Sequence, residues 1–69
     1  HRGAKVDIVL EAPDGRVVGI EDSGAGVCAI RLAGFAPIGL SGGNIVESGT
    51  RALCSHYCES LAEALEVIL

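Results

Sequence analysis

Apolar residues are concentrated in two short runs, one in the first third of the chain and one near its middle. Residues 16–20 (RVVGI) are rich in β-branched side chains and stop at two acids, the pattern of a strand buried on both faces. Residues 35–40 (FAPIGL) form the second run. Between them, Ser23 can cap a helix that continues to about Ala33, and Gly34 follows where a left-handed residue often ends a helix. The pattern predicts a right-handed strand–helix–strand unit with parallel strands.

The segments on either side of this unit have patterns of their own. Val6, Ile8 and Leu10 occupy alternate positions within residues 5–12, as in a strand, and the Pro-Asp-Gly turn signal after them predicts a hairpin with the first apolar run. Residues 45–53 are a helix candidate that an internal glycine weakens. Ser60 and Glu63 form a capping box, which predicts a last helix over residues 61–69.

These elements do not make a closed hydrophobic core by themselves. Arg31 is the only polar residue between positions 27 and 33, so we expect the first helix to be covered on several sides. A parallel pair of strands with two apolar faces needs further strands to complete its sheet. A chain of 69 residues also buries only about 60% of the surface that it exposes when unfolded. We therefore expect an α/β fold that is part of a larger domain, within a longer chain that we call the parent protein.

Charge and cysteine content narrow the classes of partner and compartment. Five basic and nine acidic residues give a formal net charge of −4, which argues against nucleic acid or an anionic membrane as the main partner. No apolar run reaches the length of about 18 residues that a membrane span needs. Three cysteines, an odd number, fit reduced thiols in a cytoplasmic protein better than a disulfide framework.

Glu21 and Asp22 follow the first apolar run, and this position makes them candidate functional residues. In open α/β sheets, ligands bind beyond the carboxyl ends of the strands. Adjacent carboxylates beside an apolar strand repel each other, and a hard divalent cation such as Mg²⁺ offsets that repulsion. The turn over residues 23–26 adds backbone N–H donors at a helix start. The structural alternative is an acidic cap that complements the helix dipole.

The chain resembles a known family over residues 17–69. The string VVGIEDSGAGV at residues 17–27, followed by Ala-Gly and Pro-Ile-Gly, resembles haloacid dehalogenase (HAD)-type hydrolases, above all their phosphoglucomutase-like sugar-phosphate phosphatases. Residues 54–61 (CSHYCESL) resemble the final short strand and helix of that fold. The resemblance implies the C-terminal portion of a three-layer α/β/α, Rossmann-like core with a mainly parallel sheet, so that residues 1–69 form a partial domain.

The resemblance also implies roles for three residues. Glu21 and Asp22 would hold the Mg²⁺ that bridges a phosphate and a nucleophilic aspartate, and Lys5 would steady both, although the prolines of the family's K-P-x-P-D-type segment are absent. The D-x-D-x-T nucleophile motif, the second motif's Ser/Thr strand and the cap domain are also absent from these residues. The expected function is Mg²⁺-dependent hydrolysis of phosphate monoesters of small metabolites, such as sugar phosphates, by the parent protein, with this chain alone inactive.

Two other functions are open at this point. Residues 24–29 (GAGVCA) match the dinucleotide fingerprint G-x-G-x-x-A, which would indicate an NAD- or FAD-binding Rossmann segment. Against it, the two acids before the glycines would repel a pyrophosphate, and the second strand lacks a ribose-binding acid. An incomplete sheet could instead belong to a noncatalytic remnant or interaction module that pairs with another chain through an edge.

Two further sequence features have both a functional and a structural interpretation. Cys54, His56 and Cys58 would share one face of a strand and could chelate zinc, but no fourth ligand is evident, so buried thiols beside a surface histidine are favoured. The glycine-rich segment 42–44 could hold a phosphate or form a turn.

Overall fold

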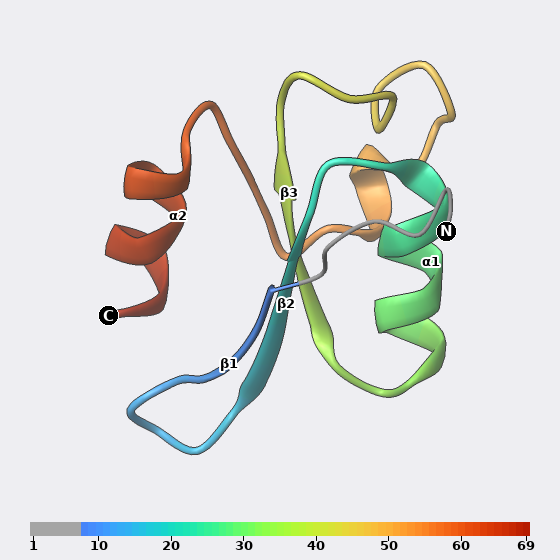
Figure 1. Ribbon diagram of the computed structural model, residues 1–69. Helices are drawn as coiled ribbons and strands as arrows, with labels where there is room; N and C mark the ends of the chain where they lie inside the picture. The colour runs from blue at the N-terminus through green and yellow to red at the C-terminus, as the bar shows by residue number, and fades with distance from the viewer. Residues whose placement is uncertain (1–7) are drawn as a thin grey trace.

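The computed structural model describes residues 8–69, which form a small α/β domain built on a four-stranded mixed sheet (Figure 1). Lys5 lies outside the described residues, so the role predicted for it stays a prediction. The sheet order is β1-β2-β3-β4, with β1 antiparallel to β2 and the other two pairings parallel. In chain order the elements are β1 (Ile8–Glu11), β2 (Val17–Glu21), α1 (Gly24–Leu32), β3 (Ala36–Leu40), the 3₁₀ helix η1 (Arg51–Leu53), β4 (His56–Cys58) and α2 (Leu61–Ile68).

The predicted hairpin is present at the start of the described chain. Strands β1 and β2 pair antiparallel, with Ile8 opposite Ile20. The connecting turn is closed by the Gly15 backbone N–H, which donates to the Ala12 carbonyl at 2.8 Å, and Gly15 has a left-handed φ of 91°. A glycine adopts that conformation without the strain that a Cβ would add.

The predicted strand–helix–strand unit is confirmed. Strands β2 and β3 run parallel, and α1 connects them. The helix begins where the Ser23 hydroxyl oxygen accepts a hydrogen bond from the Gly26 N–H at 3.0 Å, and it ends before Gly34, which has a φ of 89°. Gly19 lets α1 approach the sheet closely, because a Cβ at that position would lie 2.6 Å from Cδ1 of Ile30.

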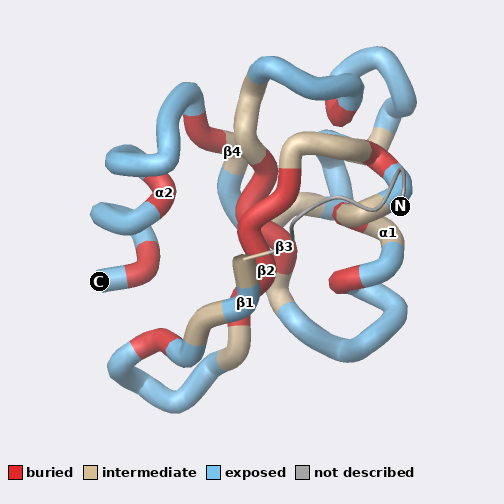
Figure 2. The backbone as a smooth tube through the Cα atoms, in the orientation of Figure 1, coloured by how far each residue is buried: buried red, intermediate tan, exposed pale blue. Residues whose placement is uncertain are grey.

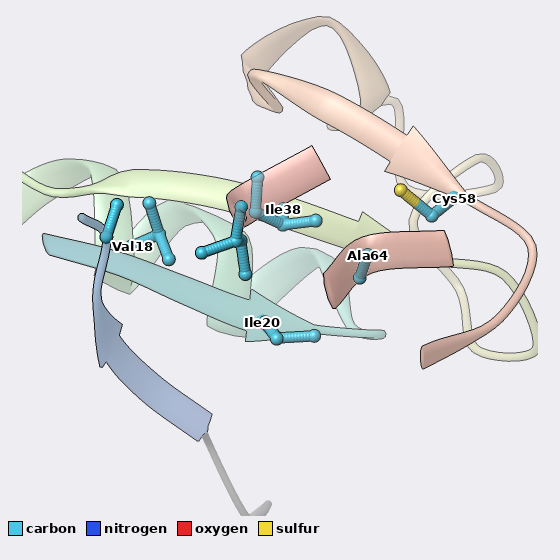
Figure 3. Packing of buried hydrophobic residues seen from close by; sticks show 7 residues of the cluster. Val18, Ile20, Ile38, Cys58 and Ala64 are labelled. Carbon is cyan, nitrogen blue, oxygen red and sulfur yellow. The ribbon is translucent and has the colours of Figure 1, made fainter. Parts of the chain in front are cut away.

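The two helices lie on opposite faces of the sheet (Figure 1). Val18, Ile20 and Ile38 form the face that Ala64 of α2 covers (Figure 3), with Cys58 and Ile68 in the same cluster. The buried residues of α1 are Gly24, Val27 and Ile30. Burial is densest along β2 and β3 in the centre of the sheet (Figure 2). These two parallel strands are therefore covered on both faces.

Helix α2 agrees with its predicted cap, whereas the helix predicted over residues 45–53 is wrong. The Ser60 hydroxyl oxygen accepts from the Glu63 N–H at 3.1 Å, as the capping box requires. Residues 45–53 instead form turns followed by the three-residue η1. The cause is Gly49, whose φ of 77° ends the helical turn, while Ile45 is anchored in the interior with 1% of its surface exposed.

The expected cover of α1 is present on one side only within residues 8–69. Leu32 in its last turn keeps 87% of its surface exposed. The outer edges of β1 and β4 have no strand partner among the described residues. In the same part of the chain, no helix combines the length and the apolar character needed to cross a bilayer.

Candidate functional site

The candidate site lies at the carboxyl end of β2, where the chain turns into α1. Because β2 and β3 are parallel, with Glu21 opposite Gly39, their carboxyl ends lie at the same edge of the sheet. Residues 41–50 leave β3 at that edge and return over the start of α1, where Gly24 would bring a Cβ to 2.1 Å from the Ser48 hydroxyl oxygen. Strand, helix start and loop therefore meet around Glu21 and Asp22.

Glu21 is a buried carboxylate that organises the turn. Only 3% of its surface is exposed. Its Oε1 accepts hydrogen bonds from the Asp22 N–H at 2.9 Å, from the Ser23 N–H at 3.1 Å and from the Ser23 hydroxyl at 3.1 Å. Gly26 leaves room for this carboxyl group, because a Cβ there would lie 2.2 Å from the Glu21 Cδ. These contacts support part of the structural interpretation, in which an acid stabilises the start of the helix.

Asp22 has a different environment from its neighbour. It is half-buried, and within residues 8–69 its carboxylate oxygens accept no hydrogen bond from a protein group. Its backbone is held at both ends, since its N–H donates to Glu21 and its carbonyl oxygen accepts from the Asn44 N–H at 3.1 Å. A carboxylate on a held backbone, without a protein donor of its own, is suited to bind a cation.

Asn44 is a site residue that the sequence did not single out by itself. Its side-chain Oδ1 accepts a hydrogen bond from the Gly24 N–H at 2.8 Å, while its own backbone N–H donates to Asp22. Gly43 beside it allows the close approach, because a Cβ there would lie 1.9 Å from the Asp22 carbonyl oxygen. Segment 42–44, interpreted above as a phosphate loop or a turn, therefore braces the β2–α1 connection.

Protein groups already use most of the donors at the start of α1. Asn44 accepts from the Gly24 N–H, and Ser23 accepts from both Gly26 and Val27. Among the described residues, this leaves the Ala25 N–H as the one donor of the first turn without a protein acceptor. A dinucleotide pyrophosphate requires several free donors at a helix start, so this geometry does not favour the dinucleotide alternative.

Cys54 and Cys58 lie on opposite faces of the sheet, so the shared face predicted for them is wrong. Cys54 precedes β4 and lies near Gly39, where a Cβ would be 2.8 Å from its Sγ, whereas Cys58 is in the cluster under α2. His56 between them is exposed. Burial raises the pKa of both thiols above the ordinary value of 9.0, which keeps them protonated at neutral pH. Because the two thiols lie on different faces of the sheet, they do not share a zinc site.

Protein-family models, curated proteins and solved structures were compared with this chain, and none of them matches it. Within residues 8–69, no three His, Cys, Asp or Glu side chains are grouped as a set of metal ligands.

Proposed function

We propose that Asp22 is a Mg²⁺ ligand in a HAD-type phosphatase, of which residues 1–69 form the C-terminal part of a three-layer, mainly parallel core. The observation that carries the proposal is the Asp22 carboxylate. It lies at the carboxyl end of a buried parallel strand, its backbone is fixed, and no group of residues 8–69 donates to it. Ligands of open α/β sheets bind at this position.

Mg²⁺ fits this carboxylate by its coordination chemistry. The ion prefers hard oxygen ligands, and it commonly uses one or two carboxylates together with water and a substrate phosphate. Glu21 directly before Asp22 adds negative charge next to the ligand, which favours a divalent cation there. Glu21 Oε1 also accepts from the Asp22 and Ser23 N–H groups and so orders the turn that carries Asp22, while its role as a second Mg²⁺ ligand stays a prediction.

The proposed reaction is hydrolysis of a phosphate monoester of a small metabolite, such as a sugar phosphate. A bound Mg²⁺ would offset charge that develops on the phosphate oxygens. The nucleophilic aspartate would come from the parent protein, since the D-x-D-x-T motif is absent here. Lys5 is the proposed phosphate-steadying lysine.

Phosphatase assays with the parent protein test this function. We expect p-nitrophenyl phosphate turnover to require Mg²⁺ and Asp22→Asn to lower kcat/KM by about 100-fold, because loss of a metal ligand removes several kcal/mol of transition-state stabilisation. Asp14→Asn is the matched control, since it makes the same change at an exposed turn at the other end of β2. The 69-residue chain alone should have no activity.

Two results would reject the proposal. The first is full Mg²⁺-dependent turnover by the Asp22→Asn protein. The second is a parent protein that has no phosphatase activity with Mg²⁺, which would favour the noncatalytic interaction module instead.

A further inference from the structure

A pocket lies at the end of the sheet opposite to Asp22. It has a volume of about 420 Å³ and is lined by Arg16, Val17, Arg31, Gly34, Phe35 and Ala36, at the amino ends of β2 and β3 and the carboxyl end of α1. The five residues of β2 separate it from the candidate magnesium site at Asp22 by roughly 17 Å. Its volume falls within the range of about 300–1,000 Å³ that is usual for small-molecule sites.

Two arginine side chains line this pocket although the chain is acidic. Of the five Lys and Arg residues, three lie within residues 8–69, and two of these three, Arg16 and Arg31, line the pocket. The third, Arg51, stacks over the Tyr57 ring with 4.7 Å between its guanidinium carbon and the ring centroid. Asp14 forms an ion pair with Arg16, so Arg31 supplies the uncompensated positive charge that favours an anionic ligand here.

Both guanidinium groups are held at one nitrogen and keep further donors. The Arg16 Nε donates to Oδ2 of Asp14 at 2.7 Å, and an Arg31 terminal nitrogen donates to the Leu53 carbonyl at 2.6 Å. A guanidinium carries five N–H donors, so each group can still bind an anion. Because the Leu53 carbonyl is neutral, this hydrogen bond does not compensate the positive charge of Arg31. Side chains held in advance also lose less entropy when a ligand binds.

The remaining lining residues supply an apolar wall. Phe35 exposes 40% of its surface, and Val17 and Ala36 beside it are half-buried. Gly34 has no side chain and a left-handed φ of 89°, so nothing projects from it into the space. A partly exposed ring next to small residues accommodates a flat aromatic group.

We infer that this pocket binds a small organic anion with an aromatic body, with the anionic group at Arg31 and Arg16 and the ring against Phe35. The positive charge of the arginines favours an anionic group on the ligand, and the exposed Phe35 ring favours an aromatic group. This ligand site is separate from the phosphate site proposed at Asp22.

Equilibrium dialysis of 1-naphthoate against the parent protein tests the inference, with neutral 1-naphthalenemethanol as the comparison ligand. We expect 1-naphthoate to bind at least about tenfold more tightly than the alcohol, because charge-assisted hydrogen bonds require the carboxylate. Arg31→Gln should weaken naphthoate binding about tenfold and leave the alcohol unaffected, whereas Phe35→Ala should weaken both. Arg51→Gln, the matched charge control, should leave both affinities unchanged.

Equal affinity for the two ligands, or equal effects of Arg31→Gln and Arg51→Gln on naphthoate, would overturn the inference. Arg16→Gln gives a second test at the other guanidinium should Arg31→Gln fail to fold. Asp22→Asn should not alter naphthoate binding, so this inference and the magnesium proposal fail independently.

Discussion

Glu21 and Asp22 are adjacent in the chain, yet they have opposite environments. Glu21 is directed toward α1, where Gly26 leaves space for its carboxyl group and the β2–α1 turn donates to its Oε1. Asp22 lies one residue beyond the strand, and its carboxylate receives no donor from residues 8–69. Glu21 therefore stabilises the turn through its hydrogen bonds, and the turn holds Asp22 at the end of the strand.

Asn44 should matter for metal binding because it fixes the backbone of the Asp22–Gly24 turn. Asn44→Ala removes the acceptor of the Gly24 N–H and should lower the free energy of unfolding by about 1–2 kcal/mol. It should also weaken Mg²⁺ binding about tenfold, in the range expected when a partner that orients a metal ligand is lost. Urea unfolding and Mg²⁺ titration of the same protein measure the two effects.

Glu47→Ala is the control for this prediction, because Glu47 is an exposed residue of the same loop. It should change stability by less than about 0.5 kcal/mol. Unchanged Mg²⁺ affinity in Asn44→Ala would show that the loop does not position Asp22.

At the scale of elements, the confirmed predictions are those with a local chemical signal. The α1 cap at Ser23 and the turn before Arg16 depend on residues within a few positions of each other, so the sequence alone predicts them. The error over residues 45–53 has a local and a non-local cause. Gly49 lies within the segment, and its left-handed φ of 77° ends the helical turn, whereas the burial of Ile45 depends on packing against the rest of the chain. The brace from Asn44 to Gly24 joins residues 20 positions apart, a contact that local patterns do not reveal.

The cap of α2 gives a prediction at this scale. Ser60→Ala removes the acceptor of the Glu63 N–H and should cost about 1 kcal/mol of unfolding free energy, because a helix-start donor loses its partner. Ser55→Ala is the control, since the Ser55 hydroxyl makes no hydrogen bond within residues 8–69. Thermal or urea unfolding monitored by circular dichroism measures both. Equal stability of the two variants would contradict the capping role.

At the scale of the whole molecule, the sheet is held between helices on its two faces, and the candidate site lies where one of these helices begins (Figure 1). The sequence predicted the α/β class and the parallel pair from apolar runs of the right length. It did not predict that Leu32 would be exposed, because exposure depends on how the complete chain packs. The open edges of β1 and β4 within residues 8–69 are compatible with the proposed completion of the sheet by the parent protein.

The buried thiols predict how stability depends on pH. Burial raises the pKa of the Cys58 thiol, with Glu63 adding to the effect, and burial also raises that of Cys54. A thiol whose pKa is higher in the folded state stabilises the fold below about pH 9, and this contribution is lost as the pH rises toward the folded-state pKa. The free energy of unfolding should therefore fall above about pH 9.

Urea unfolding of the protein between pH 7 and 10.5 tests the thiol prediction. The double variant Cys54→Ala and Cys58→Ala should start from a lower stability at pH 7, because buried side chains are truncated, and should then lose less with rising pH. A parallel decline in the double variant and the unaltered protein would show that other groups cause the alkaline loss.

Calorimetric titration of Mg²⁺ into the parent protein is the most direct test of the central claim, which is that Asp22 binds the metal. We expect the unaltered protein and Asp14→Asn to bind Mg²⁺ alike, and Asp22→Asn to bind it at least about 100-fold more weakly. An Asp22→Asn protein that is folded and binds Mg²⁺ as tightly as the unaltered one would contradict it.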